Sequence, residues 1–352
     1  MKKISFCLPV IAKSPAGGFK VVFEYANKLS ERGYDITLYF DCSTHLQKYF
    51  MPDFIRMFIC KLMVYYYPRW FQLDYRIKKL AVNGINDGSI MKSDIIFATA
   101  IETSFFVANL SDEKGKKYYL IQDFENWNFS DQIVNNSFNL GMKNVAISKW
   151  LCKKVEGVSG VCSYVPNAIR TDVFKITNAI EDRNNHCVML LYHEGVHKGL
   201  EYAFRVLEKL KQRYPDLQVN MFGTPEKPES LADWINYKRN ASETELLEMY
   251  NNSSVFLCAS INEGFGLTGL ESMACGCALV STAYSGVLEY AVDGYNALLS
   301  PVKDVDSLYS NIVKLFEDNE LRIRIASQGA EDAKSFSWEN TMKQLETQIN
   351  SK

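Results

Sequence analysis

The amino-acid sequence predicts an α/β protein with two doubly wound parallel-sheet domains. Short apolar runs alternate with amphipathic helical segments along the chain, and the alternation begins again after a polar interval at residues 177–185, which we expect to be a linker. This pattern is typical of βαβ units, in which crossover helices join parallel strands. The chain of 352 residues is also long enough for two domains of ordinary size. We therefore expect the ligand in a cleft between two such domains.

The first half of the chain opens with a βαβ unit. An apolar run at residues 4–10 predicts a strand, the Gly17-Gly18 pair follows it, and residues 19–32 have apolar side chains at helical spacing. Residues 35–40 predict the second strand of the unit. The G-x-G-x-x-G spacing of dinucleotide-binding folds is absent. Further strands are expected at residues 94–98, 117–122, 144–147 and 161–165.

The second half repeats the alternation of strands and helices. Ser242 and Glu245 have the spacing of a capping box at the start of one helix. We expect a first domain at residues 1–170, a second at residues 171–335, and a C-terminal helix at residues 336–352 that packs back toward the first domain. The expected strands are residues 187–192, 217–222, 255–259 and 278–282. The expected helices are residues 200–214, 242–251, 268–275 and 304–318.

Composition points to a reducing compartment. The nine cysteines include no C-x-x-C pair, and several of them lie in apolar, core-like segments. Met1 leads directly into a strand-like segment without the pattern of a signal peptide, and no uncharged apolar run approaches about 18 residues. We therefore expect a cytoplasmic protein.

Charge is distributed unevenly between the two halves. Residues 1–170 carry 22 Lys and Arg against 15 Asp and Glu, whereas residues 171–352 carry 17 against 26. The first half therefore suits an anionic partner better than the second half. A difference in solvated surface charge is the equally simple alternative. The net charge of -2 makes nucleic acid a weak candidate, and we expect none as a partner.

Residues 48–80 form the most basic and aromatic segment of the chain. This composition is compatible with peripheral contact with an anionic membrane, or with the wall of an acceptor site for a lipid diphosphate. The simpler interpretation, which we prefer, is an amphipathic helix packed on the sheet. Its cations are Lys48, Arg56, Lys61, Arg69, Arg76, Lys78 and Lys79. Its aromatic residues include Phe50, Phe54, Phe58, Tyr65, Tyr66, Tyr67, Trp70 and Phe71.

Two carboxylates, Glu263 and Glu271, flank a glycine-rich turn. The apolar run at residues 255–260 precedes the turn, and a helix-like segment at residues 270–276 follows it. A turn between a strand and a helix presents backbone N–H groups at the helix N-terminus, where phosphate binds. Each carboxylate can accept hydrogen bonds from hydroxyl groups on one side of that phosphate. A sugar nucleotide has this layout of sugar, diphosphate and ribose.

Residues 263–282 read E-G-F-G-L-T-G-L-E-S-M-A-C-G-C-A-L-V-S-T. This stretch resembles the nucleotide-sugar segment of the retaining glycosyltransferases of family 4, including their Glu-x7-Glu pair. The resemblance implies the GT-B fold, in which two Rossmann-like domains face each other across a cleft. The similarity extends unevenly over nearly the whole chain. The other similar segments are residues 17–37, 144–151, 165–174 and 285–299.

The resemblance implies a role for each of several residues. Glu271 corresponds to the glutamate that binds the ribose hydroxyls, Glu263 to the one that faces the transferred sugar, and Lys198 to a lysine that neutralises the diphosphate. The simpler alternatives are a helix-terminal carboxylate for Glu271 and a solvent-facing loop carboxylate for Glu263. The expected catalytic residues are Glu263 and Lys198. The remaining donor-binding residues are expected to be Gly17, Gly18, His193, Gly264, Phe265, Gly266, Leu267, Thr268 and Glu271.

The sequence departs from the family pattern at two places. An arginine usually lies a few residues before the lysine, and here His193 has roughly that place, so the cation is weaker and depends on pH. An ordinary histidine at a strand end is the alternative. The histidine that many relatives have after a central strand of the first domain is also missing. Gln122 and Asp123 occupy that region and are possible contacts of the sugar or the acceptor.

The resemblance as a whole implies a retaining, hexosyltransferase-type enzyme that needs no metal and no other cofactor. It would transfer a sugar from a nucleoside diphosphate sugar to a glycan or lipid-linked glycan, in bacterial-type surface polysaccharide assembly. The sequence shows no cluster of residues with metal-ligand spacing. Two alternatives stay open: a catalytically silent sugar-nucleotide-binding partner, and another GT-B enzyme such as an epimerase or a phosphorylase.

Overall fold

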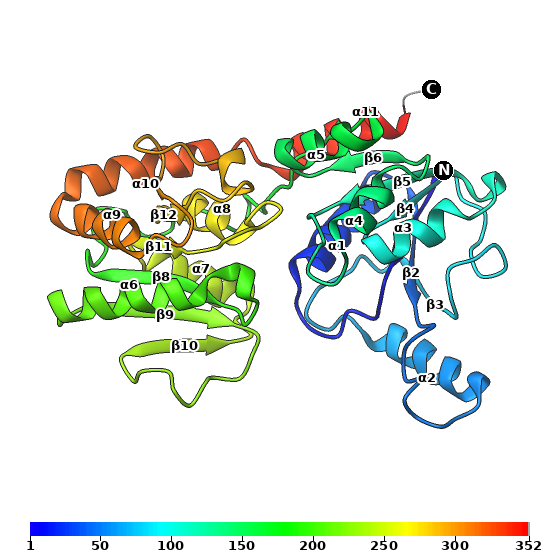
Figure 1. The fold of residues 1–352 in the computed structure, drawn as a ribbon, viewed down its shortest axis with the longest axis horizontal. Helices are drawn as coiled ribbons and strands as arrows, with labels where there is room; N and C mark the ends of the chain where they lie inside the picture. The colour runs from blue at the N-terminus through cyan, green and yellow to red at the C-terminus, as the bar shows by residue number, and fades with distance from the viewer. Residues whose placement is uncertain (351–352) are drawn as a thin grey trace. The chain divides into compact units, whose positions relative to one another are not determined.

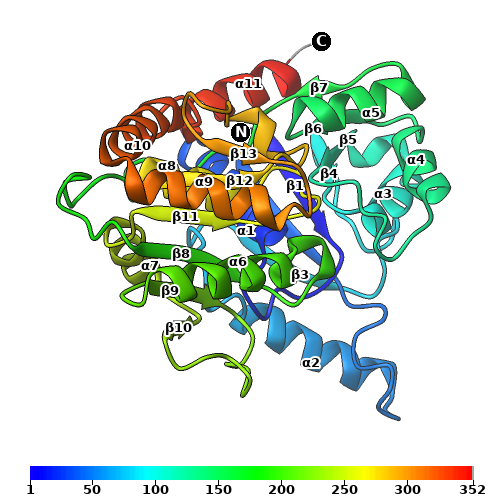
Figure 2. The ribbon, with the colours of Figure 1, turned by 60° about the vertical axis from the view of Figure 1, so that its left-hand side comes forward.

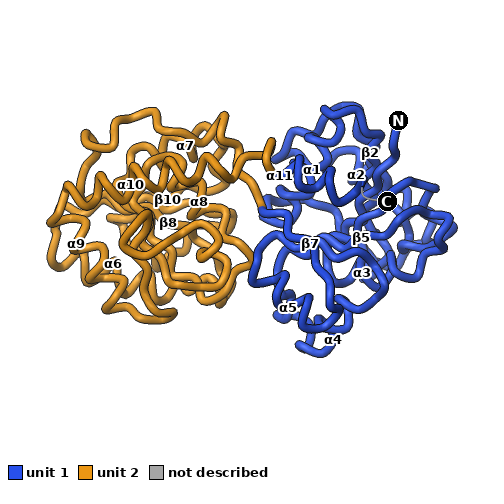
Figure 3. The backbone as a smooth tube through the Cα atoms, turned by 90° about the horizontal axis from the view of Figure 1, so that it is seen from above, with its two compact units in different colours: residues 1–166, 341–352 blue, residues 167–340 orange. Residues whose placement is uncertain are grey.

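A computed structural model describes residues 1–350 and divides the chain into two compact α/β units (Figure 3). Unit 1 comprises Met1–Pro166 and the C-terminal segment from Thr341, and unit 2 comprises Asn167–Asn340. The sequence predicts a boundary between the domains after residue 170, and in the structure it lies between Pro166 and Asn167. Among the described residues, no helix combines the length and the apolar character needed to cross a membrane.

Unit 1 contains a seven-stranded, all-parallel sheet with the order β3-β2-β1-β4-β5-β6-β7 (Figure 1). The interior strand β1 pairs with β2 through Ile4 and Ile36, and with β4 through Ile4 and Ile95. These strands are buried on both faces, as apolar parallel strands must be when helices cover the sheet. The strands are β1 (Lys3–Leu8), β2 (Asp35–Asp41), β3 (Lys78–Val82), β4 (Ile95–Ala98), β5 (Lys116–Ile121), β6 (Lys143–Ala146) and β7 (Ser163–Tyr164).

The helices of unit 1 include one from the C-terminal end of the chain. Tyr118 Oη in β5 donates a hydrogen bond to the Gln348 carbonyl over 3.2 Å, and Lys2 Nζ donates to the Ile349 carbonyl over 2.9 Å. The last helix is therefore part of the same unit as the first strand. The helices are α1 (Gly17–Glu31), α2 (Asp53–Tyr66), α3 (Ile101–Ala108), α4 (Asp131–Phe138), α5 (Lys149–Ser159) and α11 (Trp338–Asn350), with a short 3-10 turn at Asp112–Lys114.

The α2 helix packs on the edge strand β3 through a narrow stripe only. Arg56, Cys60 and Val64 are its buried residues, and they recur at every fourth position. The aromatic residues of the same helix are exposed. The interpretation of residues 48–80 as a helix packed on the sheet is therefore right for one face of α2 and wrong for the aromatic face.

Unit 2 contains a six-stranded parallel sheet with the order β10-β9-β8-β11-β12-β13. Its helices are α6 (Leu200–Arg213), α7 (Glu243–Asn251), α8 (Leu267–Ala274), α9 (Val305–Glu317) and α10 (Asn319–Ala333) (Figure 2). Short 3-10 turns lie at Val196–Lys198 and Val287–Glu289. The strands are β8 (Cys187–Tyr192), β9 (Gln218–Gly223), β10 (Ile235–Arg239), β11 (Val255–Cys258), β12 (Ala278–Thr282) and β13 (Leu298–Ser300).

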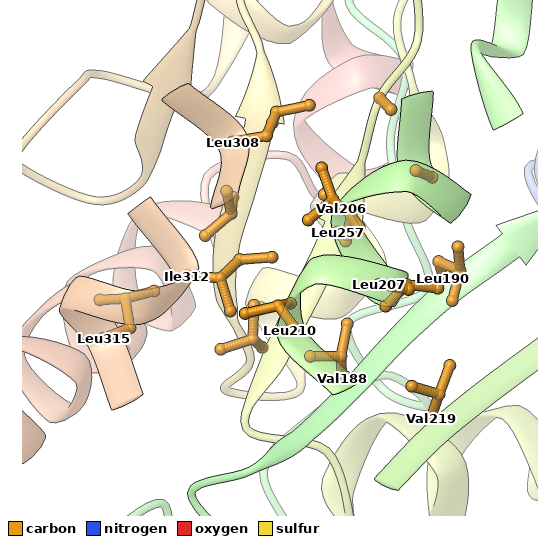
Figure 4. Close-up of a cluster of buried hydrophobic side chains, with 14 of the residues drawn as sticks. Val188, Leu190, Val206, Leu207, Leu210, Val219, Leu257, Leu308, Ile312 and Leu315 are labelled. Atoms are coloured by element: carbon orange, nitrogen blue, oxygen red, sulfur yellow. The ribbon is translucent and has the colours of Figure 1, made fainter. Parts of the chain in front are cut away.

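The hydrophobic core of unit 2 fixes the strands that carry the loops described below. Figure 4 shows Leu207 and Leu210 of α6 beside Val188 of β8, with Ile312 of α9 on the other side of the cluster. All four side chains are completely buried. Burial of each contributes roughly 1.5–3 kcal/mol relative to exposure. The β8 and β11 strands are thereby held rigidly under their loops.

One expected linker is part of the unit 2 interior. Residues 177–185 were expected to join the domains because they are polar, but they lie within unit 2. Arg183 is buried there, and its guanidinium donates to the carbonyls of Ser253, Gly276 and Cys275 over 2.7–3.1 Å. The connection between the units lies at Pro166–Asn167 instead.

Candidate active site

The candidate site lies at the point where the strand order of unit 2 reverses. The chain runs from β8 to β9 and β10 on one side of the sheet and then returns to β11, β12 and β13 on the other. The first strands of the two series, β8 and β11, are hydrogen-bonded neighbours. In doubly wound sheets, ligands bind at the carboxyl ends of the strands at such a switch point. The loops that leave these ends are residues 193–199 and 259–266.

The two loops are fastened to each other. The backbone N–H groups of Ile261 and Asn262 donate to the His197 carbonyl over 2.7 and 3.3 Å. Gly199 has a φ of +60°, and a Cβ at this position would lie 2.0 Å from the Ala259 carbonyl oxygen. Only glycine permits both this backbone conformation and this close approach. The loops therefore form one surface and are held in a fixed register.

Lys198 and Glu263 form an ion pair between these loops. Lys198 Nζ lies 2.8 Å from Glu263 Oε2, and the two side chains are only 20% and 12% exposed. Ser260 donates its hydroxyl hydrogen to the other carboxylate oxygen, Oε1, over 2.5 Å. The Ser260 carbonyl in turn accepts a hydrogen bond from the Thr282 hydroxyl. Both oxygens of the Glu263 carboxylate are thus held in place.

The environment of Glu263 keeps it ionised. Burial raises the pKa of the carboxyl group, but the Lys198 ammonium and the hydrogen bonds from Lys198 and Ser260 outweigh burial and hold the pKa below its ordinary value. Glu263 is therefore a carboxylate throughout the neutral range. A negative group fixed in this way can stabilise positive charge that develops close to it.

The two histidines of the first loop are neutral. Burial lowers the pKa of His193, and the nearby Lys198 and His197 lower it further. Burial and then Lys198 also lower the pKa of His197. His193 Nδ1 accepts a hydrogen bond from the Gly195 N–H over 2.9 Å, which shows that this nitrogen is unprotonated. Lys198 is thus the cation of this loop, and His193 does not supply a second positive charge in the unliganded site.

The glycine-rich turn is shaped by two buried tyrosines. Gly266 precedes α8 with a φ of +89°, and its carbonyl accepts a hydrogen bond from Tyr290 Oη over 2.6 Å. A Cβ on Gly266 would lie 1.9 Å from Tyr284 Oη. The backbone of Gly264 to Thr268 therefore runs into the first turn of α8, as expected. The Phe265 side chain is buried against the rings of Tyr290 and Phe336, so only its backbone faces the site.

Glu271 lies in the second turn of α8. Its side chain is buried, and its Oε2 atom accepts a hydrogen bond from Tyr250 Oη over 3.3 Å. Tyr250 is itself completely buried in the core. Glu271 therefore lies in the same helix as Leu267 and Thr268, which belong to its first turn. Glu263 precedes the glycine-rich segment 264–266 and Glu271 follows it.

The expected residues of unit 1 form a second group at the carboxyl end of its sheet. Gly17 and Gly18 begin α1, and a Cβ on Gly18 would lie 3.5 Å from Gln122 Nε2. Gln122 follows β5, and its Nε2 donates to the Thr99 carbonyl over 3.1 Å. Its Oε1 is buried, and no group among residues 1–350 donates a hydrogen bond to it. Asp123 accepts a hydrogen bond from the Phe124 N–H over 2.8 Å through Oδ1.

Several residues of these sites were not foreseen from the sequence. Ser260, Tyr284 and Tyr290 support the Glu263 turn, but no role was assigned to them from the sequence. In unit 1, burial raises the pKa of Glu125 to about 8, with smaller contributions from Glu102 and Asp123. The only sequence signal for Glu125 was its place three residues after Gln122. Within the described part of the chain, no group of three or more His, Cys, Asp or Glu side chains is arranged to hold a metal ion.

Part of the chain is similar in sequence to known glycosyltransferases. Residues 177–332 match the family model of the glycosyl transferases group 1. A D-inositol 3-phosphate glycosyltransferase of Corynebacterium urealyticum is 29% identical over 164 residues, which are 42% of this chain and 39% of that protein. An N,N'-diacetylbacillosaminyl-diphospho-undecaprenol alpha-1,3-N-acetylgalactosaminyltransferase of Campylobacter jejuni is 28% identical over 153 residues, which are 42% of this chain and 40% of that protein. The chain thus matches about two fifths of the length of these curated relatives.

A solved structure resembles the whole chain. HepE from Anabaena, in complex with UDP and glucose, has a TM-score of 0.75 to this structure, with 100% of both chains covered and 15% sequence identity. A likeness at this level of identity concerns the fold. The chain therefore has the GT-B fold of two Rossmann-like domains, and its residues 177–332 match the glycosyl transferases group 1.

Proposed function

We propose that the protein is a retaining glycosyltransferase of family 4 and of the hexosyl-transferring type. It moves a sugar from a nucleoside diphosphate sugar to a hydroxyl group of a glycan or lipid-linked glycan. The GT-B fold and the match of residues 177–332 support the transferase class. The name of the Campylobacter relative, which includes a diphospho-undecaprenol, supports a lipid-linked acceptor. We extend the proposal to a role in bacterial-type surface polysaccharide assembly. The free cysteines support a cytoplasmic location.

The Lys198–Glu263 ion pair at the switch point carries this proposal. It lies beside the first turn of α8, where backbone N–H groups and the helix dipole favour an anion. In our proposal the diphosphate binds Lys198 and this first turn, and it draws the ammonium away from Glu263. The Glu263 carboxylate then accepts hydrogen bonds from the sugar hydroxyls. Glu271 accepts hydrogen bonds from the ribose, and unit 1 receives the acceptor near Gln122 and Asp123.

The reaction we propose is a substitution on one face of the sugar, by analogy with the family. The bond between the anomeric carbon and the leaving phosphate oxygen breaks, and the acceptor oxygen bonds to the same face of that carbon. The departing phosphate oxygen takes the proton of the acceptor hydroxyl. Glu263 offsets the positive charge that develops at the anomeric carbon. The scheme contains no metal ion and no other cofactor.

A donor screen tests this function directly. Thermal unfolding is measured with UDP-, GDP-, ADP-, CMP- and dTDP-sugars, because a ligand of the folded state raises the melting temperature. UDP-hexoses come first, since HepE was solved with UDP and glucose. The stabilising donor is then incubated with lipid and glycan extracts, with and without EDTA, and the anomeric configuration of the product is determined. We expect the sugars of one nucleotide base to raise the melting temperature. We also expect a product of retained anomeric configuration, formed in the same amount with and without EDTA.

Single substitutions assign the roles. Lys198→Ala and Glu271→Ala are each expected to weaken nucleoside diphosphate binding about tenfold or more, since each removes a charged partner. Glu263→Ala is expected to lower kcat at least about a hundredfold and to leave diphosphate affinity equal or tighter, because Lys198 loses its competing carboxylate. Glu248→Ala on the exposed face of α7 is the matched control. Unchanged affinity in both of the first two variants, or an active Glu263→Ala enzyme, would contradict the proposed site.

One observation keeps a second candidate in view. Glu263 neutralises Lys198, and both neighbouring histidines are uncharged, so the unliganded site offers little net positive charge to a diphosphate. This favours a catalytically silent sugar-nucleotide-binding partner as the alternative. Such a protein would pass the thermal screen but transfer nothing to any extract. Conversion of the donor alone would indicate an epimerase, and dependence on inorganic phosphate would indicate a phosphorylase.

A further inference from the structure

The outward face of α2 is apolar and aromatic. Its six exposed apolar residues are between 40% and 83% exposed. At 100° per residue they occupy an arc of roughly 120° on the helix. The centre of this arc lies opposite the buried stripe of Arg56, Cys60 and Val64. We call it the α2 aromatic face, and its members are Phe54, Ile55, Phe58, Leu62, Tyr65 and Tyr66.

This arrangement departs from the usual amphipathic helix. A surface helix normally turns its apolar face to the core and its charged face to water. In α2 the face toward the protein contains Arg56, whose guanidinium donates to the Cys42 carbonyl over 2.6 Å and to Asn83 Oδ1 over 2.7 Å. The polar contacts of Arg56 and the burial of Cys60 and Val64 anchor the helix to unit 1 and leave its aromatic face outside. Figures 1 and 2 both show α2 at the periphery of unit 1, beyond β3. Large exposed apolar patches in soluble proteins are usually binding surfaces.

Exposed cations precede α2 in the sequence, lie on it and follow it. Lys48 and Lys61 are exposed, and Arg69 is exposed with its guanidinium over the Tyr66 ring, 4.8 Å from the centroid. Among residues 1–350, no carboxylate lies within ion-pair distance of these three side chains. Other cations of the segment are engaged: Arg76 pairs with Asp74, and Lys78 pairs with Asp35. The border of the aromatic face therefore has a net positive charge.

A pocket of about 590 Å³ opens beside the C-terminal half of α2. Lys61, Tyr65 and Phe71 are among the residues that line it, so it continues the aromatic face. Lys79 also lines the pocket, but its ammonium donates to the carbonyls of Tyr65 and Tyr67 at the end of α2. Lys61 is therefore the cation that remains to meet an anionic group in this pocket.

We propose that the α2 aromatic face binds an anionic phospholipid bilayer. The aromatic and aliphatic side chains enter the boundary between headgroups and acyl chains, and Lys48, Lys61 and Arg69 meet the headgroup phosphates. A second copy of this chain fits the same face less well, because a symmetric contact would bring the bordering cations of both copies together. The inference does not depend on the proposed sugar transfer, since α2 contains none of the residues assigned to donor binding.

Vesicle co-sedimentation tests this proposal. The full chain is sedimented with vesicles of phosphatidylcholine alone and with vesicles that also contain phosphatidylglycerol, at low and high salt. We expect binding to the anionic vesicles only, weakened by salt. Phe54→Ser/Phe58→Ser is expected to weaken it more than tenfold, and Lys61→Gln about fivefold, because one cation near an anionic surface contributes about 1 kcal/mol. Phe106→Ser is the matched control, since Phe106 is an exposed aromatic residue of α3 in the same unit.

The possible results separate this proposal from its alternatives. Nucleotide affinity is measured on every variant, so that a misfolded protein is not mistaken for a non-binding one. Equal binding of the wild type and the Phe54→Ser/Phe58→Ser variant would overturn the proposal, as would absence of binding to anionic vesicles. A dimer in sedimentation velocity that this double variant dissociates, without vesicle binding, would assign the face to self-association. None of these results bears on the proposed sugar transfer, which is measured in a separate assay.

Discussion

The Lys198–Glu263 pair sets the acid–base behaviour of unit 2 at the scale of single residues. Because the pKa of Glu263 in the folded chain is depressed, its ionisation stabilises the fold above the unfolded pKa of about 4.3. This contribution is lost as the pH falls through the lower, folded pKa. Removal of Lys198 reverses the sign: burial then raises the pKa of Glu263, and stability is lost as the pH rises through that raised value.

Two variants are therefore expected to come closer to the wild type in stability at acidic pH, for different reasons. Lys198→Met should lower the free energy of unfolding by roughly 1–3 kcal/mol relative to the wild type at neutral pH. Part of this loss should be recovered below pH 5, because the unpaired Glu263 carboxylate becomes protonated. The stability deficit of Glu263→Gln relative to the wild type should also shrink at acidic pH, since the wild type loses its own ion pair there. Urea unfolding between pH 3.5 and 8 measures both. Asp306→Asn, which breaks the exposed pair with Lys209, serves as the control. A deficit of either site variant that stays the same between pH 8 and pH 3.5 would refute the pairing.

The turn before α8 shows what backbone geometry requires at the scale of an element. Gly266→Ala would force a φ of +89° on a residue with a Cβ and push that Cβ into Tyr284 Oη, 1.9 Å away. Gly294→Ala would impose a similar φ of +71°, but no atom lies within 4 Å of its Cβ. Since both substitutions share the backbone strain, the difference between them isolates the contact with the tyrosine.

We expect Gly294→Ala to cost about 1 kcal/mol and Gly266→Ala at least about 2 kcal/mol more. Gly266→Ala should also weaken nucleoside diphosphate binding, because the first turn of α8 moves with it. Thermal unfolding and calorimetry with UDP provide the two readouts. Tyr284→Phe in the Gly266→Ala background removes the nearest atom and should restore part of the stability. Equal costs for the two glycine substitutions would show that the turn tolerates a side chain.

The elements that the sequence predicted are those with strong periodicity and burial. The strand at residues 187–192 matches β8 without error, and Ser242 caps α7 with the expected reciprocal bonds to Glu245. The missed strands β3, β10 and β13 are short and lie at or near the sheet edges, where one side faces solvent and the apolar pattern is weak. The motif located the Glu263 turn, whereas its support by Tyr284 and Tyr290 depends on tertiary contacts that no local pattern encodes.

At the scale of the whole molecule, unit 1 depends on a segment that follows unit 2 in the sequence. Met342, Leu345 and Ile349 of α11 are almost completely buried. A chain that ends at residue 340 should therefore lose several kcal/mol of stability in unit 1, at roughly 1.5–3 kcal/mol for each lost side chain. Unit 2 and its nucleotide affinity should change little, because α11 contributes to unit 2 only at its first residues.

Urea unfolding of the truncated chain with and without UDP tests this dependence. UDP should shift only the transition of unit 2, which identifies the weakened transition as that of unit 1. Glu339→Ala/Asn340→Ala in the full chain changes exposed residues just before the cut and is the control. A single transition that UDP shifts as a whole would mean that the two units unfold together.

Because unit 1 is made of two segments that are distant in the sequence, it cannot complete its fold during synthesis until unit 2 has been translated. Residues 1–166 emerge first, but their unit lacks α11 until all of Asn167–Asn340 has been made. At about 5–20 residues per second, that interval lasts roughly 10–35 s. During this time the sheet of unit 1 exposes the surface that α11 covers in the complete chain. Unit 2 can meanwhile complete its own core. We therefore expect chaperones to bind nascent chains whose synthesis has stopped within unit 2.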